Sequence, residues 1–370
     1  MLLWLLLVGL LACPAIAQVT FTRGQKFQII LLGSPDTSKT PLPPTDAPVW
    51  DIDLFDSDTA TIRALKSAGK IVICYFSAGT VEDWRDDVRQ FPTADVGKVL
   101  PEWPNEKWIR TGSTAIRNIM QARIKLAADK GCDAIDPDNT GCIQNDNGLN
   151  LKNTDAIEYM RWMQGIAAGH NMKIGLKNSL DILDALTPIM DFAVNEQCAQ
   201  LSECQAYDRF LATNKPVFHI EYPIPLNPSQ ANSTYCIGPG TAGMSTVLKN
   251  MNLDGFTIYC DGSQVETPTK GGTSPPRPSN PPKPTTVRPP NPPRPTTTRP
   301  PNPPLPTTIR PPNPPRPTTS RPPNPPIPSG GGCTAKHWDQ CGGNDWKGCT
   351  VCESPYRCQG VSAPWYYQCL

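Results

Sequence analysis

The stretch GCDAIDPDNT, residues 131–140, decides the fold of the larger part of this chain. It holds a short apolar run that ends in two aspartates. It follows the helical segment Ala115–Asp129, in which apolar residues recur every three or four positions. A helix is the usual crossover between parallel strands. Residues 115–140 therefore predict one helix-strand unit of a parallel α/β fold, with acids at the carboxyl end of its strand.

The same alternation recurs over residues 18–265. Helical stretches such as Thr154–Gly169 separate eight β-rich runs. These runs are Phe27–Leu32, Val49–Asp53, Ile71–Ser77, Ala134–Asp138, Lys173–Asn178, Phe192–Glu196, Val217–Tyr222 and Phe256–Asp261. Eight strand-helix units in about 250 residues are typical of a (β/α)8 TIM barrel, which is the α/β fold class that we predict.

Polar side chains stand at the ends of several predicted strands. In such a barrel the carboxyl ends of all strands meet at one mouth, which holds the active site. The candidate acids there are Asp53, Glu82, Asp136, Asp138, Glu196, Glu221 and Asp261. The other candidates for substrate binding are Tyr75, Asn139, Lys177, Asn178 and Tyr222.

Convergent carboxylates indicate glycoside hydrolysis. In that reaction one carboxyl protonates the leaving oxygen, and a second acts as nucleophile or base. The chain has three histidines, one Cys-x-x-Cys pair, no phosphate-binding loop and no nucleophile-elbow serine. We therefore expect neither a metal nor a cofactor. The spacing alone does not select the catalytic pair among the seven acids.

The first residues are typical of a secreted protein. Residues 1–17 hold an apolar run followed by Ala15 and Ala17, which predicts a signal peptide cleaved after Ala17. No other stretch is apolar enough for a membrane anchor. Asn232 begins a glycosylation sequon, which matters in a secreted chain.

Fourteen cysteines indicate disulfides and an oxidising compartment. Cys198 and Cys204 flank the loop after Glu196, and a disulfide between them would hold that loop rigid. The pairs Cys132–Cys142 and Cys236–Cys260 are further predictions, and they leave Cys74 as a buried free thiol.

Composition divides the remaining chain into three parts. Residues 18–265 are mixed, residues 266–332 are rich in Pro, Thr, Arg and Asn, and residues 333–370 hold six cysteines. Up to Glu266 the first part has 22 basic and 30 acidic residues, a net charge of −8, whereas the linker beyond has nine basic residues and no acid. Arg-Pro-Pro-Asn-Pro-Pro recurs there with a period of eleven residues. We predict a disordered, solvated polyproline II spacer.

The last part is too short to bury a stable apolar core, so we expect disulfides to staple it. It contains the motifs Trp338-Asp339-Gln340-Cys341-Gly342-Gly343 and Trp365-Tyr366-Tyr367-Gln368-Cys369. Over residues 336–370 it resembles the small fungal-type cellulose-binding modules of family 1. The resemblance implies a small disulfide-rich β module.

The same resemblance implies a flat face whose aromatic rings stack on sugar rings. By motif, this face consists of Trp338, Trp365, Tyr366 and Gln368. The implied disulfides are Cys341–Cys358 and Cys352–Cys369, and the remaining Cys333 and Cys349 would form a third.

A second set of motifs spans residues 25–262. It comprises Trp50-Asp51-Ile52-Asp53, CYFSAGTVEDWR at 74–85, Trp103-Pro104-x-Glu106-x-Trp108, DAIDPDN at 133–139, GLKN at 175–178, NEQC at 195–198, Glu203-Cys204 and Ile220-Glu221-Tyr222. Together these motifs resemble the endo-α-1,4-polygalactosaminidase family. The resemblance implies a TIM barrel that cleaves α-1,4-linked galactosamine polymers with retention of configuration. It also implies Asp138 as nucleophile and Glu196 as general acid/base.

Galactosamine units without acetyl groups are cationic, and an acidic domain would attract them. We hypothesise that five acids form cation-binding subsites around the catalytic pair: Asp53, Glu82, Asp136, Glu221 and Asp261. The Michaelis constant for a cationic polymer would then depend on ionic strength. The alternative for each acid is a structural ion pair with a base such as Arg85 or Lys177.

These features predict a secreted, extracellular, endo-acting glycoside hydrolase that its C-terminal module holds on cellulose or chitin. One alternative is a glycosidase of the same fold that acts on another plant or fungal wall glycan. The other is a non-catalytic wall-binding protein. Nothing in the sequence indicates nucleic acid or a membrane as a partner.

Overall fold

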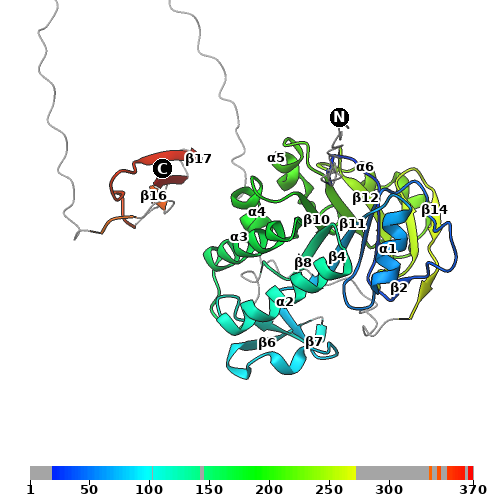
Figure 1. Ribbon diagram of the computed structural model, residues 1–370. Helices are drawn as coiled ribbons and strands as arrows, with labels where there is room; N and C mark the ends of the chain where they lie inside the picture. Colours follow the sequence, from blue (N-terminus) through cyan, green and yellow to red (C-terminus); the bar gives the residue numbers. More distant parts are fainter. Residues whose placement is uncertain are drawn as a thin grey trace, which may run out of the picture. The chain divides into compact units, whose positions relative to one another are not determined.

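Figure 1 shows the chain as a computed structural model. The structure describes residues 19–101, 103–141, 146–271, 333–335, 340–342, 348–362 and 366–369. They fall into two compact units, Met1–Pro293 and Arg294–Leu370, and each is described by itself. The predicted signal peptide and nearly all of the predicted linker lie outside the described residues.

The first unit is built on a ten-stranded sheet of order β1-β3-β4-β8-β9-β10-β11-β12-β13-β14. The first eight strands are parallel: β1 Phe27–Ile30, β3 Val49–Asp53, β4 Ile71–Ser77, β8 Ala134–Asp138, β9 Lys173–Lys177, β10 Phe192–Glu196, β11 Val217–Glu221 and β12 Ser245–Lys249. After β1, the amides of Leu31 and Leu32 donate to the carbonyl of Leu253, after β12, over 2.9 and 3.2 Å. These contacts curl the sheet closed, and the predicted TIM-barrel fold class is confirmed.

The prediction for the eighth strand was wrong. The parallel set is completed by β12, and the predicted strand at 256–261 is β13, Phe256–Tyr259, which pairs antiparallel with β12. A last strand, β14 at Gln264–Glu266, pairs antiparallel with β13. Because β13 runs backwards, its carboxyl end lies at the amino-terminal end of the barrel. The sequence STVLK of β12 is short and partly polar, so its pattern did not predict a strand.

Helices cover the outside of the barrel between consecutive strands (Figure 1). They are α1 Thr59–Ser67, α2 Thr114–Lys130, α3 Asn153–Gly169, α4 Leu180–Leu186, α5 Asp208–Leu211 and α6 Thr234–Ile237. The two predicted helices are confirmed as α2 and α3. In α2, Ile116, Met120 and Ile124 share the buried face, and the helix ends at Gly131 with a left-handed φ of 93°. Among the described residues, no helix is both long and apolar enough to cross a membrane.

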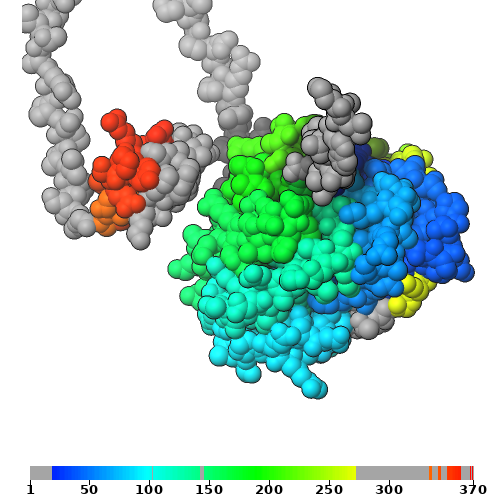
Figure 2. Space-filling model, in the orientation of Figure 1, coloured from blue at the N-terminus to red at the C-terminus, as the bar shows by residue number. Residues whose placement is uncertain are grey.

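A small antiparallel sheet extends the connection between β4 and α2. It contains β5 Thr80–Glu82, β7 Trp103–Ile109 and β6 Val96–Leu100, in that order. Figure 2 shows this region as a lobe at the lower edge of the view. A second pair, β2 at Ser34–Pro35 and β15 at Thr269–Lys270, joins the two ends of the unit.

The interior of the barrel changes from apolar to polar along the strands. Near the amino-terminal ends, the rings of Phe27, Phe192 and Phe218 pack together, with centroids 4.8 and 5.6 Å apart. Gly175 makes room for this cluster, since a Cβ there would lie 2.2 Å from the Phe192 ring. The aromatic cluster fills one end of the barrel and leaves the polar side chains at the other.

Six disulfides link the described cysteines. The predicted pairs Cys198–Cys204 and Cys236–Cys260 are confirmed, as are the three in the C-terminal unit. The prediction for Cys132 was wrong. It pairs with Cys74, which is therefore not a free thiol, because β4 and β8 are neighbours in the sheet. Cys142 lies outside the described residues.

The second unit contains a three-stranded antiparallel sheet of order β16-β18-β17. Its strands are β16 Gln340–Gly342, β17 Cys358–Ser362 and β18 Tyr366–Cys369. Cys341 and Cys369 are buried at its centre, so the disulfides take the place of an apolar core, as predicted.

Removal of the Cys74–Cys132 disulfide should destabilise the barrel more than removal of Cys198–Cys204. The cysteines of the two bridges are 58 and 6 residues apart. Because the entropy lost by the unfolded chain grows with loop length, we expect losses of ~4 and ~2 kcal/mol. Denaturant unfolding of the two double Cys→Ala variants measures both. Equal losses would contradict this chain-entropy explanation.

Candidate active site

Three neighbouring strand ends bring opposite charges together around Lys177. Its Nζ, at the end of β9, lies 3.3 Å from Asp138 Oδ2 at the end of β8 and 3.2 Å from Glu196 Oε2 at the end of β10. The Lys177 side chain is fully buried, whereas those of Asp138 and Glu196 are 9% and 16% exposed. Solvent and substrate can therefore reach the two carboxyls, but not the ammonium that joins them.

Asp138 is oriented by two further donors. The hydroxyl of Tyr75, on the adjacent strand β4, donates to Asp138 Oδ2 over 2.9 Å. The backbone amide of Asn139 donates to Oδ1 over 2.7 Å. Each carboxylate oxygen is thus held by at least one donor, which fixes the plane of the carboxylate.

Glu196 is oriented by Asn178 and Tyr222. Asn178 accepts from the Glu196 amide through Oδ1 (2.8 Å) and donates from Nδ2 to Glu196 Oε2 (3.3 Å). The Tyr222 hydroxyl, just after β11, donates to Glu196 Oε1. Asn178 therefore holds both the backbone and the side chain of this residue.

The backbone turns sharply directly after Asp138, Lys177 and Glu196. Asn139, Asn178 and Gln197 have left-handed φ values of 60°, 49° and 67°. Such a conformation costs a non-glycine residue about 1 kcal/mol or more, and it tends to cluster at functional sites. Three of these positions at adjacent strand ends support the assignment of the active site to this mouth.

Two further carboxyls lie deeper in the barrel. Asp51 on β3 and Asp136 on β8 are both buried, with exposed fractions of 1% and 0%. Burial raises the pKa of Asp136 to about 7, although the nearby Lys177 ammonium opposes this shift. Burial, and next the charge of Asp136, raise the pKa of Asp51 well above its usual range. The structure therefore disfavours two ionised carboxylates at this depth.

The prediction that Asp53 and Glu82 form cation subsites was wrong. Arg85 donates to both oxygens of Asp53 (3.2 and 2.6 Å), and its Nε donates to Glu82 Oε1 over 3.0 Å. Arg123 on α2 lies 3.3 Å from Glu82 Oε2. All four side chains are almost fully buried. Both carboxylates are thus already compensated and closed to substrate.

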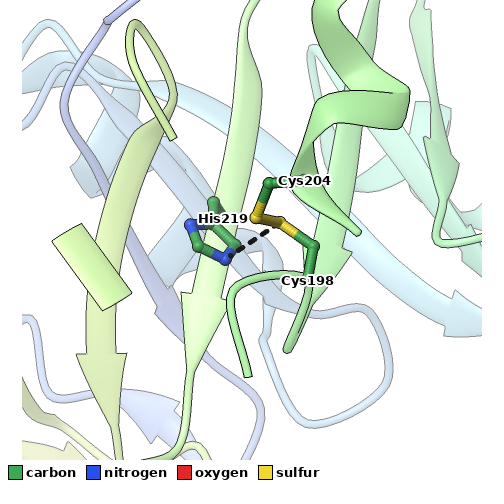
Figure 3. A group of neighbouring side chains, drawn as sticks. All are labelled: Cys198, Cys204 and His219. Atoms are coloured by element: carbon green, nitrogen blue, oxygen red, sulfur yellow. Dashed lines mark hydrogen bonds between the residues drawn. A yellow bond between two sulfur atoms is a disulfide. The ribbon is translucent and has the colours of Figure 1, made fainter. Parts of the chain in front are cut away.

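Glu221 also does not line the mouth. Alternation along β11 puts Glu221 and His219 on the outer face of the strand, with Oε1 2.7 Å from His219 Nε2. Oε1 also accepts from the amide of Ala199 over 2.7 Å. Figure 3 shows His219 beside the Cys198–Cys204 disulfide, with Nε2 3.3 Å from Cys198 Sγ. Glu221 thus anchors the loop that follows Glu196.

Cys198, Cys204 and His219 lie within 4.8 Å of one another, close enough to share a metal ion. Cysteine binds metals as a thiolate, however, and both sulfurs here are joined in the disulfide. We therefore assign this group to the rigidity of the loop.

Asp261 lies at the opposite end of the barrel, because it follows the antiparallel strand β13. There its charge interacts with Lys26 and Asp46, which precede β1 and β3. The prediction that it faces the mouth was wrong. Asn139 lies near the mouth, but its side chain donates to Ser77 Oγ (3.1 Å).

The structure brings together seven of the predicted site residues: Tyr75, Asp136, Asp138, Lys177, Asn178, Glu196 and Tyr222. The sequence reasoning missed Asp51, although it lies two positions before Asp53 and so shares its strand face. It also missed Arg123, whose charge at a buried position of α2 was a usable signal. In the second unit, Trp338 and Trp365 lie outside the described residues, and only the backbone of Tyr366 and Gln368 is described.

Both units of the chain are similar to known protein families. Residues 12–265 match the model of glycoside-hydrolase family GH114, and residues 337–366 match the fungal cellulose binding domain. The crystal structure of Aspergillus fumigatus Ega3 in complex with galactosamine is 44% identical, covers 66% of this chain and 99% of that chain, and has a TM-score of 0.62. The glycoside hydrolase domain of PelA from Pseudomonas aeruginosa has the same fold at 13% identity, covering 63% and 98%, with a TM-score of 0.50.

Curated relatives resemble this chain over short stretches. Feruloyl esterase B of Talaromyces stipitatus is 68% identical over 40 residues, which is 11% of either chain. A lytic polysaccharide monooxygenase of family AA9 from Thermothelomyces thermophilus is 51% identical over 41 residues, 11% of this chain and 13% of that protein. The chain thus spans only about a tenth of the length of these relatives.

Replacement of Arg85 should destabilise the barrel strongly. Among the described residues, Arg85→Met leaves buried Asp53 with only the backbone amides of Phe55 and Asp56 as donors, and it leaves buried Glu82 with Arg123 as its ion-pair partner. We expect a loss of about 3–5 kcal/mol. Arg209→Met is the matched control, because Arg209 pairs with Asp184 on the surface and should lose at most about 1 kcal/mol. Urea unfolding of both variants tests this difference. Equal losses would mean that the buried ion pairs of Arg85 stabilise the fold no more than a surface ion pair does.

Proposed function

Because the chain belongs to glycoside-hydrolase family GH114, we propose that it cleaves an α-1,4-linked, galactosamine-containing polysaccharide at internal bonds. The observation that carries this proposal is the pair Asp138 and Glu196, which share the ammonium of Lys177 at the barrel mouth. Glycoside hydrolysis requires two such carboxyls. The substrate class is supported by the similarity to Ega3, whose crystal structure holds galactosamine.

The separation of the two carboxyls favours retention of configuration. The oxygens that contact Lys177 lie at most 6.5 Å apart, the sum of 3.3 and 3.2 Å. Carboxyl groups of retaining enzymes lie about 5–5.5 Å apart, and those of inverting enzymes about 6.5–9.5 Å. This upper limit lies at the lower edge of the inverting range, so a covalent glycosyl-enzyme intermediate is the better fit.

The two carboxyls take different roles in this mechanism. Asp138, the more buried of the two, attacks the anomeric carbon while Glu196 gives its proton to the glycosidic oxygen. Glu196 then takes a proton from the water that releases the sugar from Asp138. The greater exposure of Glu196 suits this role, because both leaving group and water arrive from solvent. Tyr75 and Lys177 hold Asp138 for in-line attack.

Four of the five acids hypothesised as cation-binding subsites do not explain the attraction of a cationic polymer. Asp53, Glu82 and Glu221 are compensated or face outward, and Asp261 lies at the far end. We assign the attraction to the net charge of −8 of residues 18–266 and to the carboxyls at the centre of the mouth.

The C-terminal module would hold the enzyme on a wall surface. We propose that Trp338, Trp365, Tyr366 and Gln368 form the face that binds cellulose or chitin. Secretion to the extracellular space is supported by the predicted signal peptide and by the disulfides of both units. Asn232 is exposed, as a glycosylated residue must be.

A second candidate function is hydrolysis of another plant or fungal wall glycan. It is favoured by the short matches to curated proteins, which include Endo-1,4-beta-xylanase D of Talaromyces funiculosus, 61% identical over 36 residues. That likeness covers 10% of this chain and 9% of that protein, so it carries no argument about the reaction.

Incubation with a partly deacetylated α-1,4-galactosamine polymer should release oligomers that mass spectrometry detects. Asp138→Asn and Glu196→Gln should each lower the rate by about 1,000-fold or more, since each removes a reacting group. Asp129→Asn, an equal change on the exposed face of α2, is the control. The first-formed product should be the α-anomer by nuclear magnetic resonance. A β-anomer would exclude retention, and no product from the wild type would favour the second candidate.

Trp365→Ala should separate adhesion from hydrolysis. Loss of one stacking ring should weaken binding to cellulose by about tenfold or more, with hydrolysis of soluble substrate unchanged. A pull-down on crystalline cellulose and a soluble-substrate assay on the same preparation measure both. Unchanged cellulose binding would remove this residue from the proposed face.

A further inference from the structure

Asp51 and Asp136 have no role in the mechanism proposed above, although they lie inside the same barrel. They come from β3 and β8, which are separated by β4. Alternate strands supply the side chains of one interior layer in such barrels. Asp138 stands two residues beyond Asp136 on β8 and thus one layer nearer the mouth, with Glu196 on β10. The buried pair therefore lies directly beneath the proposed catalytic pair.

The surroundings of this pair require a proton. The oxygens of Asp51 and Asp136 are shielded from solvent, and among the described residues none places a conventional donor within bonding distance of them. The two carboxyls instead lie close enough for one to donate a hydrogen bond to the other when it carries a proton. Ionised carboxylates only accept hydrogen bonds, so this bond exists only when one of the two carries a proton. An ionised carboxylate without donors would also be costly to bury.

Charged and titratable groups face Asp136 from each strand packed around it. They are Asp51 from β3, Tyr75 from β4, Asp138 from β8 itself, Lys177 from β9 and Glu196 from β10. Lys177 is the cation that acts on Asp51 and Asp136 as well as on the upper pair. Any negative charge on the lower pair therefore competes with Asp138 and Glu196 for the same ammonium.

Building on the catalytic pair proposed above, we propose that Asp51 and Asp136 are positioning residues that must be uncharged for full activity. While neutral, they leave the Lys177 ammonium to Asp138 and Glu196. When the pair loses its first proton, the new charge draws Lys177 toward the barrel interior and loosens both catalytic carboxyls. Asp136, with a pKa raised to about 7 by burial, is the group that ionises first.

This pair should set the alkaline limb of activity. In the wild type, kcat should fall as the pH rises through about 7, with KM less affected, because the charge acts on the reacting groups. Asp136→Asn keeps the shape but cannot ionise, so its alkaline limb should move up by about one pH unit or more. Asp129→Asn is the matched control. All enzymes meet the same polymer, so titration of the substrate amines cancels in the comparison.

Stability provides a readout that does not depend on the substrate. A carboxyl with a raised pKa in the folded state contributes stability below its unfolded pKa of 3.8 and loses it as the pH rises to about 7. Asp136→Asn should therefore gain stability relative to the wild type between pH 4 and pH 8, by urea unfolding. A constant difference across this range would overturn the proposal.

Infrared spectroscopy observes the proton directly. Wild-type protein at pH 6 should show the band of a buried protonated carboxyl, which weakens near pH 7 and is reduced in Asp136→Asn or Asp51→Asn. If those variants do not fold, Lys177→Met provides the test. Loss of the cation should move the titration to higher pH, because Lys177 lowers the pKa of Asp136. Absence of the band at pH 6 would refute the proposal even if the polymer proves to be the wrong substrate.

Discussion

The ammonium group of Lys177 lies 3.2 Å from one carboxyl and 3.3 Å from another in a place that water does not reach. An unpaired ammonium at that depth would lose its proton or destabilise the fold by several kcal/mol. Carboxyls on both neighbouring strands remove this penalty, and in return the ammonium holds them close together. The order β8-β9-β10 in the sheet makes this possible, because residues at the ends of adjacent parallel strands meet at one edge.

The barrel contains a second buried ionic cluster, in which the acids are neutralised by bases. Around Arg85 and Arg123, each carboxylate is matched by a guanidinium in a closed site. Around Lys177, the acids among the described residues outnumber the cations, and two of these acids reach the mouth. The first arrangement ties the β4–α2 connection to the barrel, and the second leaves uncompensated negative charge at the mouth, where we propose the reaction. The number of bases within reach of an acid therefore separates the structural carboxyls from those that we propose as catalytic.

Other contacts in the barrel maintain the shape of the mouth. Aromatic rings seal the amino-terminal end of the barrel, so the polar side chains gather at the other end. The loop after Glu196 is fastened by the Cys198–Cys204 disulfide and by Glu221, which binds its backbone from outside the barrel. Glu221 was predicted as a mouth residue, and the structure shows it supporting the mouth from behind.

The sequence by itself determined the features that depend on neighbouring residues. Helical and strand periodicity arise within a few positions, so α2, α3 and seven of the eight parallel strands could be predicted. So could the polar strand ends. The six cysteines of the C-terminal module were paired correctly, because the module resembles a family whose pairing implies two of the bridges and leaves Cys333 and Cys349 for the third.

Only the tertiary structure decided which groups meet across long stretches of chain. Arg85 reaches Asp53 over 32 positions, and Arg123 reaches Glu82 over 41. The Cys74–Cys132 disulfide spans 58. Likewise, the reversed direction of β13 depends on its pairing with β12 and not on its own residues. A local pattern shows that an acid stands at a strand end, but the packing of distant elements decides whether a base neutralises it.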